Sequence, residues 1–259
     1  MNTPDAAILG MGYLGRPLAE KLFENGGLVS ALKRSLTSDD INLPIELDAV
    51  DLNDEKVFQT AFWRKWADKE VWICLLPPSA VGRYTDLLAV WGKAAKQFGV
   101  RHIVYASSTS VYGEEARECT EHSTPQPQTA SAQKVLAAER LLLESGIEHV
   151  DILRLGGLYS AERHPLNSLL KSGKKAAGMH RPVNMLHRSR AVAALYLAAC
   201  TPSGLRIRNI VEKRHPPKHE FYRAEAVKLG LPELTFDETD CSSGKIVNTA
   251  YDDFSTVLD

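Results

Sequence analysis

Three glycines that follow the first apolar run of the chain constrain its fold more than any other feature. The run covers residues 6–9, and the glycines stand at positions 10, 12 and 15. Arg16-Pro17 comes next and favours a helix start, because proline at the first helical position loses no hydrogen bond. The segment therefore predicts a buried strand, a tight turn and a helix.

The spacing Gly-x-Gly-x-x-Gly between a strand and a helix is typical of dinucleotide-binding turns. Gly10 permits the tight turn, Gly12 lets the backbone approach a pyrophosphate, and Gly15 lets the helix pack closely on the strand. The pyrophosphate is expected at the positive end of the helix. A glycine-rich turn without any ligand is the alternative.

Composition narrows the class of protein. The 259 residues are 44% hydrophobic and 24% charged, with a formal net charge of −1, as in an ordinary globular protein. The scattered basic residues argue against nucleic acid or a membrane as the main partner. There is no apolar run of about 18 residues and no signal-peptide pattern. The four cysteines lie far apart, which favours reduced thiols in the cytoplasm over disulfides or a zinc site, and we expect no bound metal.

Apolar runs alternate with amphipathic segments in the first half of the chain. Strands are predicted at residues 6–9, 28–32, 45–50, 71–76, 102–107 and 150–155. Helices are predicted at residues 16–24, 54–66, 83–98 and 131–144. This order predicts an α/β, Rossmann-type, doubly wound parallel sheet covered on both faces. Ligands of such sheets bind beyond the carboxyl ends of the strands.

The second half of the chain is less regular. Residues 156–184 are rich in Gly, Lys, Arg and His and are predicted to be loop with little helix. A helix at 190–200, a further strand at 205–211 and a helix at 220–229 are predicted after it. We expect a dinucleotide-binding core, residues 1–158 and 184–213, and a small substrate-side lobe, residues 159–183 and 214–259, in one continuous structural unit.

Two cations follow the second predicted strand. Lys33 lies 21 positions after Gly12, and Arg34 and Ser35 follow it. NAD-specific proteins usually carry an acid about 20 residues after the glycines, to bind the ribose 2′-hydroxyl, whereas cations suit a 2′-phosphate. The pattern therefore favours NADP(H) over NAD(H), with a solvated basic strand end as the alternative.

The ends of the third and fourth strands are also candidates. Asp51 can hold the adenine amino group while Leu52 packs on the ring, or it can cap the following helix with Asn53 and Asp54. Pro77-Pro78 after the fourth strand stiffens the chain, which suits a wall beside the cofactor or an ordinary loop.

Four consecutive hydroxyl residues, 107–110, end the fifth predicted strand and precede Val111-Tyr112-Gly113. Capping the next helix needs only one or two of them. A hydroxyl beside a nicotinamide can donate a hydrogen bond to a substrate oxygen, so this run is a candidate for substrate binding.

These segments together resemble the extended and atypical short-chain dehydrogenase/reductases, a superfamily that includes NAD-dependent sugar-nucleotide epimerases and dehydratases. The resemblance covers almost the whole chain, and the residues that carry it are 10–15, 107–113, 152–159, 184–187 and 209–211. The segment Arg163-His164-Pro165 is similar to one in a bacterial subgroup of atypical members.

The resemblance implies roles for particular residues. Ser108, three positions before Val111, corresponds to the residue that polarises the substrate oxygen. Lys134 fits the lysine that binds the nicotinamide ribose, which puts Ala130 in the place of the acid/base tyrosine. Shifting the frame by one residue puts Ser131 there instead.

No tyrosine stands between Tyr112 and Tyr159, so the usual Ser–Tyr–Lys mechanism is not available. A positioned acid/base contributes about 10²–10⁴-fold in rate, and alanine cannot supply it. By position, Tyr112, Tyr159, His164 and His187 are candidate substitutes, and His164 is the histidine to test first. His187 matches a family position that mostly supports the fold, and Arg190 stands where an acid usually follows it.

The candidate residues fall into two sets. Those expected to take part in catalysis are Ser108, Lys134 and His164. Those expected to contact the dinucleotide are Gly10, Met11, Gly12, Tyr13, Leu14, Gly15, Lys33, Arg34, Ser35, Asp51, Leu52, Leu75, Leu76, Pro77, Ala106, Ser107, Lys134 and Leu155.

Two functions fit these observations. The first is an NADP(H)-dependent oxidoreductase or epimerase/dehydratase-like enzyme acting on a small polar substrate, for which a sugar nucleotide is suggested by fold-level analogy. The second is an NADP(H)-binding sensor or regulatory protein that has lost catalysis, which the missing tyrosine favours. The sequence leaves the oligomeric state open.

Overall fold

A single parallel sheet of seven strands forms the centre of the protein, in the order β10-β7-β5-β4-β1-β2-β3. The computed structural model describes residues 2–40 and 42–258. The strands are β1 Ala6–Leu9, β2 Val29–Lys33, β3 Glu46–Ala49, β4 Val71–Cys74, β5 His102–Ser108, β7 His149–Leu155 and β10 Leu205–Ile210. The chain reverses its direction across the sheet between β1 and β4, which confirms the predicted doubly wound α/β fold.

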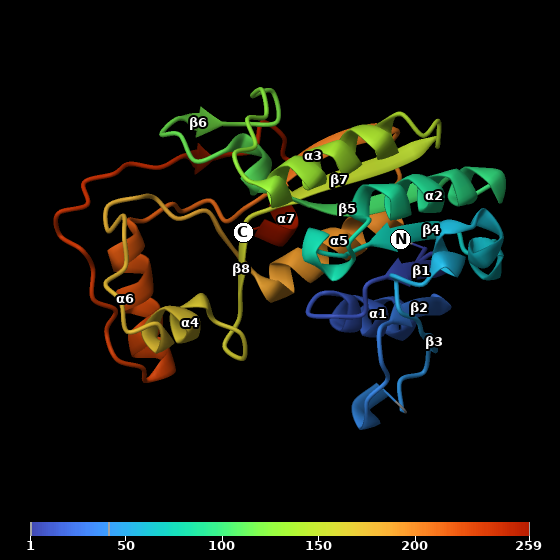
Figure 1. The fold of residues 1–259 in the computed structure, drawn as a ribbon, viewed down its shortest axis with the longest axis horizontal. Helices are drawn as coiled ribbons and strands as arrows, with labels where there is room; N and C mark the ends of the chain where they lie inside the picture. The colour runs from blue at the N-terminus through green and yellow to red at the C-terminus, as the bar shows by residue number, and fades with distance from the viewer. Residues whose placement is uncertain (1, 41, 259) are drawn as a thin grey trace.

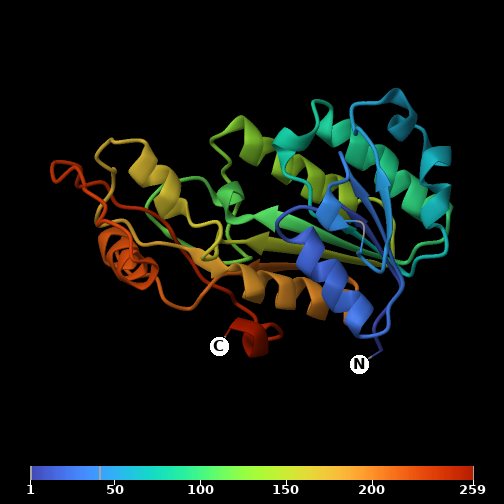
Figure 2. The ribbon, with the colours of Figure 1, turned by 90° about the horizontal axis from the view of Figure 1, so that it is seen from below.

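Helices cover both faces of the sheet (Figure 1 and Figure 2). Helices α1 Gly15–Glu24 and α5 Arg188–Cys200 pack on one face, and α2 Tyr84–Gln97 and α3 Ala130–Leu143 pack on the other. Strands β1 and β4 are buried along their whole length, because apolar side chains alternate toward two covered faces. Within the described residues, no helix is both long and apolar enough to cross a membrane.

The segment predicted as a helix over residues 54–66 is not α-helical, and that prediction was wrong. It forms two 3₁₀ segments, η2 Glu55–Phe58 and η3 Thr60–Trp66, separated by Gln59 in an extended conformation. The 3₁₀ helix repeats every three residues, so Trp63 and Trp66 bury on the same side. The Trp63 indole N–H donates to the Val57 carbonyl at 2.9 Å, which fixes the tight winding.

A small lobe lies beyond one end of the sheet (Figure 1). Residues 156–184, expected as loop with little helix, contain β8 Gly157–Tyr159 and α4 Pro165–Lys171, and β8 pairs with β9 Met185–His187. Helix α4 is too short to show an apolar period. It packs on α6 Lys218–Leu229 through a small apolar cluster. The remaining short elements are η1 Ser38–Asp40, η4 Pro78–Ala80, η5 Thr109–Tyr112, β6 Glu118–Cys119, β11 Ile246–Val247 and α7 Ser255–Leu258.

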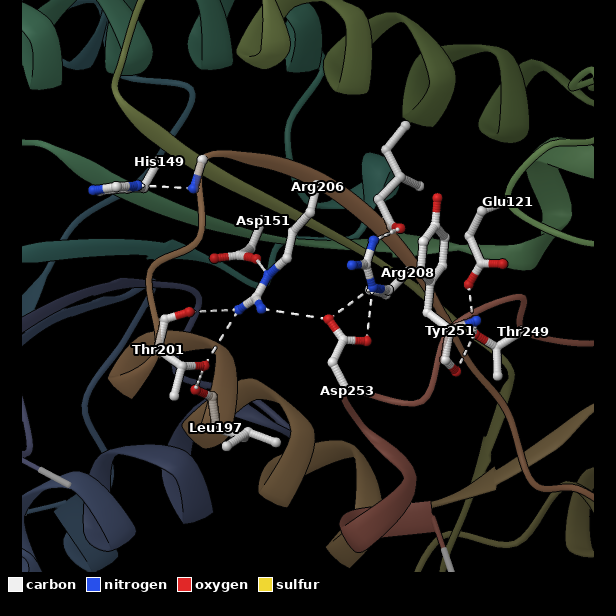
Figure 3. A network of polar contacts seen from close by, with 12 residues as sticks. Glu121, His149, Asp151, Leu197, Thr201, Arg206, Arg208, Thr249, Tyr251 and Asp253 are labelled. Atoms are coloured by element: carbon white, nitrogen blue, oxygen red, sulfur yellow. Dashed lines mark hydrogen bonds and ion pairs between the residues drawn. The ribbon is translucent and has the colours of Figure 1, made fainter.

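Ion pairs hold the C-terminal segment on the edge strand β10 (Figure 3). The Asp253 carboxylate lies between two arginines of that strand, 2.8 Å from Arg208 Nε and 3.5 Å from Arg206 Nη1. Arg206 also pairs with the buried carboxylate of Asp151 on β7. The neighbouring Phe254 is buried against α5 and the sheet. The C-terminal segment therefore packs on the sheet again, after the residues that form the lobe.

Candidate functional site

A cavity of about 610 Å³, called here the glycine-turn cavity, opens at the carboxyl ends of β1, β2, β3 and β4. The described residues that line it and were predicted from the sequence are Gly10, Met11, Gly12, Tyr13, Leu14, Lys33, Arg34, Ser35, Leu52, Leu75, Leu76 and Pro77. Those that were not among the predicted site residues are Leu32, Val50, Ala80, Leu158 and Arg163. The cavity lies where the strand order reverses, which is where open α/β sheets bind ligands.

The three glycines have three different environments. Gly10 has a φ of +114°, a conformation that side chains disfavour. A Cβ on Gly15 would lie 2.1 Å from the Gly10 carbonyl oxygen, so only glycine allows this close packing of α1. A Cβ on Gly12 would meet nothing within 4 Å. The backbone at Gly12 therefore borders open space within the cavity.

The N-terminus of α1 faces this cavity without a side-chain cap. Leu14 occupies the N-cap position and makes no capping hydrogen bond, and the first turn contains no acidic residue. Both Leu14 and the preceding Tyr13 line the cavity. The Arg16 N–H already donates to the Gly12 carbonyl oxygen at 3.2 Å and Pro17 has no N–H, so the helix dipole, together with the N–H groups that precede Arg16, suits an anion at this end of the helix.

The two cations at the end of β2 are not equivalent. Lys33 Nζ lies 2.5 Å from Asp40 Oδ2, and this contact lowers the pKa of the Asp40 carboxyl to about 2. Arg34 donates from Nη2 to the Ala80 carbonyl oxygen at 3.1 Å. Arg34 makes no ion pair within 4 Å among the described residues, so its charge is the less compensated of the two.

The apolar wall of the cavity comes from Leu32, Val50, Leu52 and Leu76. These side chains stand where a flat aromatic ring of a ligand can pack. Asp51 is exposed, and its Oδ1 accepts hydrogen bonds from the backbone and side-chain N–H groups of Asn53 at 2.9 and 3.0 Å. This geometry corresponds to the capping alternative rather than to a ligand contact.

The hydroxyl run at the end of β5 and the start of η5 is divided between the core and the surface. Ser107 is buried and donates to the Glu139 carboxylate. Ser108 is half-buried, and its Oγ accepts from the Ser110 N–H at 3.1 Å at the start of η5. That contact leaves the Ser108 hydroxyl hydrogen free to donate.

A buried ion pair between β7 and α3 lies next to the end of β5. Arg154 of β7 donates to both Glu139 oxygens at 2.9 and 2.6 Å, and Nη1 reaches the Tyr112 hydroxyl at 2.8 Å. Tyr112 in turn donates to Asn209 Oδ1 at 2.9 Å. Burial raises the pKa of Tyr112. Its hydroxyl is therefore a structural donor and a poor candidate for the missing base.

Helix α3 carries Lys134, another predicted catalytic residue. It begins at Ala130, after Thr129, whose hydroxyl accepts from the Ala132 N–H at 3.1 Å. Ser131 and Lys134 are exposed. Among the described residues, the Lys134 ammonium has no hydrogen-bond or ion-pair partner, and it does not line the glycine-turn cavity.

A second cavity of about 470 Å³, called here the lobe cavity, lies between the glycine turn and the lobe. It is lined by Tyr13, Leu158, Arg163, His164, Pro165, Ser168, Leu169, Lys218 and Tyr222. Three of these residues, Tyr13, Leu158 and Arg163, also line the glycine-turn cavity. The two cavities are therefore neighbours that share a wall.

The comparisons with known proteins support this architecture. No family model matches the chain. Protein YeeZ of Escherichia coli K12 is 30% identical over 253 residues, which cover 93% of this chain and 90% of YeeZ. The chain belongs to the YeeZ family. The fold that the resemblance inferred from the sequence implies is confirmed by solved structures.

Solved structures share the fold of this YeeZ-family chain at low identity. MoeE5 in complex with UDP-glucose and NAD has a TM-score of 0.77 at 22% identity, covering 98% of this chain and 92% of MoeE5. The Bordetella bronchiseptica enzyme WbmH in complex with NAD⁺ has a TM-score of 0.77 at 19% identity, covering 94% and 88%. The UDP-N-acetylglucosamine 4-epimerase of Bacillus cereus has a TM-score of 0.77 at 18% identity, covering 95% and 90%.

The structure of this YeeZ relative brings together most of the predicted dinucleotide contacts, but not all. Gly15 packs against the Gly10 carbonyl group and does not line the glycine-turn cavity, and the Ser107 hydroxyl is directed into the core. Ala106 lies two residues before the end of β5 and Leu155 ends β7, and neither belongs to the described lining of the glycine-turn cavity. Leu158 follows the strand predicted at residues 150–155, so its place after a strand end is the sequence feature that could have identified it. From the sequence, Arg163 stands out only as part of the segment Arg163-His164-Pro165.

The other candidates for a proton carrier are held by local contacts. Tyr159 donates to Glu212 at 3.1 Å, and burial, together with this carboxylate, raises its pKa. His187 Nδ1 accepts from the Ser189 N–H at 3.3 Å and so caps α5, which agrees with the structural role expected for it. His164 Nδ1 accepts from the Leu166 N–H at 3.2 Å, and burial lowers its pKa.

Proposed function

We propose that this chain binds a nicotinamide dinucleotide in the glycine-turn cavity and uses it as an oxidoreductase or epimerase/dehydratase-like enzyme. The observation that carries this proposal is the open space beside Gly12 at the uncapped N-terminus of α1. A pyrophosphate placed there meets backbone N–H groups and the helix dipole, while the apolar wall receives the adenine. MoeE5 and WbmH, which share the fold, hold NAD.

The proposed substrate is a small polar molecule of the sugar-nucleotide class. The MoeE5 structure, which shares the fold, contains UDP-glucose beside NAD. In the division proposed from the sequence, the core binds the cofactor and the lobe binds the substrate. The lobe cavity adjoins the glycine-turn cavity, which suits that arrangement. We place the protein in the cytoplasm, where its four unpaired cysteines stay reduced.

The proposed mechanism uses groups of this chain to bind and orient the reactants. The nicotinamide, when bound, accepts or donates a hydride. Ser108 has a free hydroxyl hydrogen that can be donated to the substrate oxygen, and the unpartnered Lys134 ammonium can bind the ribose hydroxyls. His164 carries its proton on Nε2, because Nδ1 accepts a hydrogen bond, so it acts as a donor rather than a base. We propose that water carries the proton in place of the absent tyrosine.

The cofactor preference is proposed to depend on Arg34. Its guanidinium is the less compensated cation at the end of β2 and lines the cavity. Arg34→Ala should weaken NADP⁺ binding by about ten- to a hundredfold, since a hydrogen bond to a charged group is worth about 1.5–3 kcal/mol. NAD⁺ affinity should change by no more than about threefold, because NAD⁺ has no 2′-phosphate. Calorimetric titration of both cofactors measures this.

Lys33→Ala is the matched control for this prediction. Its ammonium already pairs with Asp40, so removing it should change the selectivity less than Arg34→Ala does. Equal affinity of the parent protein for both cofactors would remove the basis for the preference. An NAD⁺ preference that is unchanged in Arg34→Ala would count equally against it.

The catalytic proposal is tested at Ser108. Ser108→Ala should lower turnover by about 10²–10³-fold, the effect of removing one oriented donor, with little change in cofactor affinity. Ser108→Thr keeps both the hydroxyl and the hydrogen bond to Ser110, and should keep most of the activity. Turnover is followed at the nicotinamide absorbance across carbonyls, alcohols and sugar nucleotides. Ala130→Tyr should raise the rate, because Lys134 already stands four residues later.

The alternative function is an NADP(H)-binding sensor, which the absence of the acid/base tyrosine favours. A sensor must interact differently with the two redox forms of the cofactor. If no substrate yields turnover while NADPH and NADP⁺ induce different conformations or partner binding, the enzyme proposal is wrong. A Ser108-dependent turnover excludes the sensor as the only function.

A further inference from the structure

We propose that Arg163 binds the pyrophosphate of the cofactor from the side of the lobe, so that the dinucleotide contacts both the core and the lobe. The inference rests on the proposed function, because it needs a dinucleotide in the glycine-turn cavity. It adds to that site a residue from outside the dinucleotide-binding core. Three features of the molecule support it: the charge balance of the cavity, the few donors at the glycine turn, and the unpaired guanidinium of Arg163.

The lining of the glycine-turn cavity carries positive charge and no negative charge. Lys33, Arg34 and Arg163 line it, and no Asp or Glu of the described residues does. Lys33 already pairs with Asp40, and Arg34 is proposed to contact the 2′-phosphate. The pyrophosphate of a dinucleotide brings further negative charge, and a guanidinium suits phosphate oxygens better than other side chains do. Arg163 is the lining cation that remains for it.

The glycine turn by itself offers few donors to a pyrophosphate. The N–H groups of the first helical turn have no partner within an ordinary helix and can bind an anion. Here the Arg16 N–H donates to the Gly12 carbonyl oxygen at 3.2 Å, and Pro17 has no N–H. Leu14 at the N-cap position adds no polar side chain. A guanidinium beside the turn would supply the donors that this helix start lacks.

Arg163 lies beside this turn with its hydrogen-bonding capacity unused. Its guanidinium carbon is 5.0 Å from the centre of the Tyr13 ring, and Tyr13 directly follows Gly12 in the chain. The Arg163 side chain is exposed, and among the described residues it makes no hydrogen bond and has no carboxylate within 4 Å. A guanidinium presents five N–H donors in a fork that matches phosphate oxygens. Arg163 is therefore both accessible and available to a ligand in the cavity.

The backbone around Arg163 fixes its place at the cavity. Residues 160–164 run from β8 to α4 at the start of the lobe (Figure 1). The Ser160 N–H donates to the Arg163 carbonyl oxygen at 3.4 Å, and the Arg163 N–H donates to Ser160 Oγ at 3.3 Å. His164 Nδ1 then caps α4 by accepting from the Leu166 N–H. Because this backbone is already held, binding an anion through the side chain costs little further ordering.

Arg188 contacts the same aromatic ring but has a different environment. Its guanidinium carbon is 5.1 Å from the centre of the Tyr13 ring, and its Nη1 lies 3.7 Å from Glu162 Oε2. Arg188 belongs to the described lining of neither the glycine-turn cavity nor the lobe cavity. It is the matched control for Arg163, because it shares the contact with Tyr13 and lacks the place at the cofactor site.

The test is calorimetric titration of the parent protein, Arg163→Met and Arg188→Met with NAD⁺, NADP⁺, ADP-ribose and adenosine. Arg163→Met keeps an unbranched side chain beside the Tyr13 ring and removes the charge and the N–H groups. Affinity for NAD⁺, NADP⁺ and ADP-ribose should fall about tenfold or more, by a similar factor for each, because all three carry the pyrophosphate. Adenosine has no phosphate and should bind the parent and Arg163→Met equally. Arg188→Met should bind all four ligands as the parent does.

Hydrogen exchange of the parent protein gives a second measurement that needs no variant. NAD⁺ should slow the exchange of residues 160–164, because Arg163 then joins this segment to the bound cofactor. If Arg163→Met does not fold, this measurement decides, and unchanged exchange of the segment on NAD⁺ binding would overturn the role of Arg163.

The outcomes separate this inference from the proposed function. A parent protein that binds neither dinucleotide rejects the proposed function, and the inference falls with it. If the parent binds a dinucleotide and Arg163→Met binds it equally well, the proposed function stands and the inference is overturned. A loss confined to NADP⁺ would assign Arg163 to the 2′-phosphate and overturn the pyrophosphate contact.

Two further results would also overturn the pyrophosphate contact. Equal losses in Arg163→Met and Arg188→Met would attribute the effect to packing on the Tyr13 ring. A matching loss of adenosine affinity in Arg163→Met would attribute it to a change in the shape of the cavity. If adenosine binds too weakly to be measured, the comparison with Arg188→Met decides.

Discussion

Replacing Gly12 by valine is expected to abolish dinucleotide binding while the protein stays folded. A Cβ at this position meets nothing within 4 Å, so a side chain can begin there without a clash in the protein itself. Its side chain would instead occupy the open space at the N-terminus of α1, where the pyrophosphate must approach the backbone. Calorimetric titration with NADP⁺ and NAD⁺, together with the thermal unfolding midpoint, measures both effects.

Gly15→Val is the contrasting control for this prediction. A Cβ there would lie 2.1 Å from the Gly10 carbonyl oxygen, so the turn and α1 would have to move apart. This variant should lower the unfolding midpoint, whereas Gly12→Val should not. A Gly12→Val protein that folds and binds either cofactor as the parent does would show that the ligand is not at this turn.

Arg154→Met is expected to lower the free energy of unfolding by about 3–5 kcal/mol, because it leaves a buried carboxylate without its cation. Glu139 is only 1% exposed, and Arg154 donates to both of its oxygens. Ser107 and Tyr112 would also lose the ion pair that organises them at the end of β5. Urea unfolding monitored by tryptophan fluorescence measures the loss.

The double variant Arg154→Met with Glu139→Leu tests whether the unpaired charge of Glu139 causes this loss of stability. Apolar replacement of both partners removes the unpaired charge, so a large part of the lost stability should return. A single variant that loses less than about 1 kcal/mol would mean that Glu139 is hydrated or protonated rather than held as a buried anion. A double variant less stable than Arg154→Met would contradict the same reasoning.

Local patterns were sufficient to predict the centre of the fold. The apolar runs predicted the strands β1 to β5 and β7 in order, since buried parallel strands are continuously hydrophobic, whereas the two-residue strand β6 was not predicted. The glycines at 10, 12 and 15 located the turn because their conformational freedom is a local requirement. The position of each strand end then identified most of the lining of the glycine-turn cavity.

What could not be predicted depends on contacts between distant residues. The direction of Ser107 is set by Glu139, which lies 32 positions later. The compensation of Lys33 by Asp40 depends on how the η1 segment folds back. The 3₁₀ winding of 60–66 follows from indole hydrogen bonds that no helical period reveals. Leu158 and Arg163 reach the cavity only because β8 leaves the sheet toward the lobe.

The central claim is that a nicotinamide dinucleotide binds in the glycine-turn cavity, and a crystal structure of the protein with NADP⁺ tests it most directly. We expect the pyrophosphate against the backbone at Gly12, the adenine between Val50, Leu52 and Leu76, and the 2′-phosphate in contact with Arg34. An empty glycine-turn cavity at a saturating concentration of cofactor, or a dinucleotide bound elsewhere on the protein, would contradict the claim.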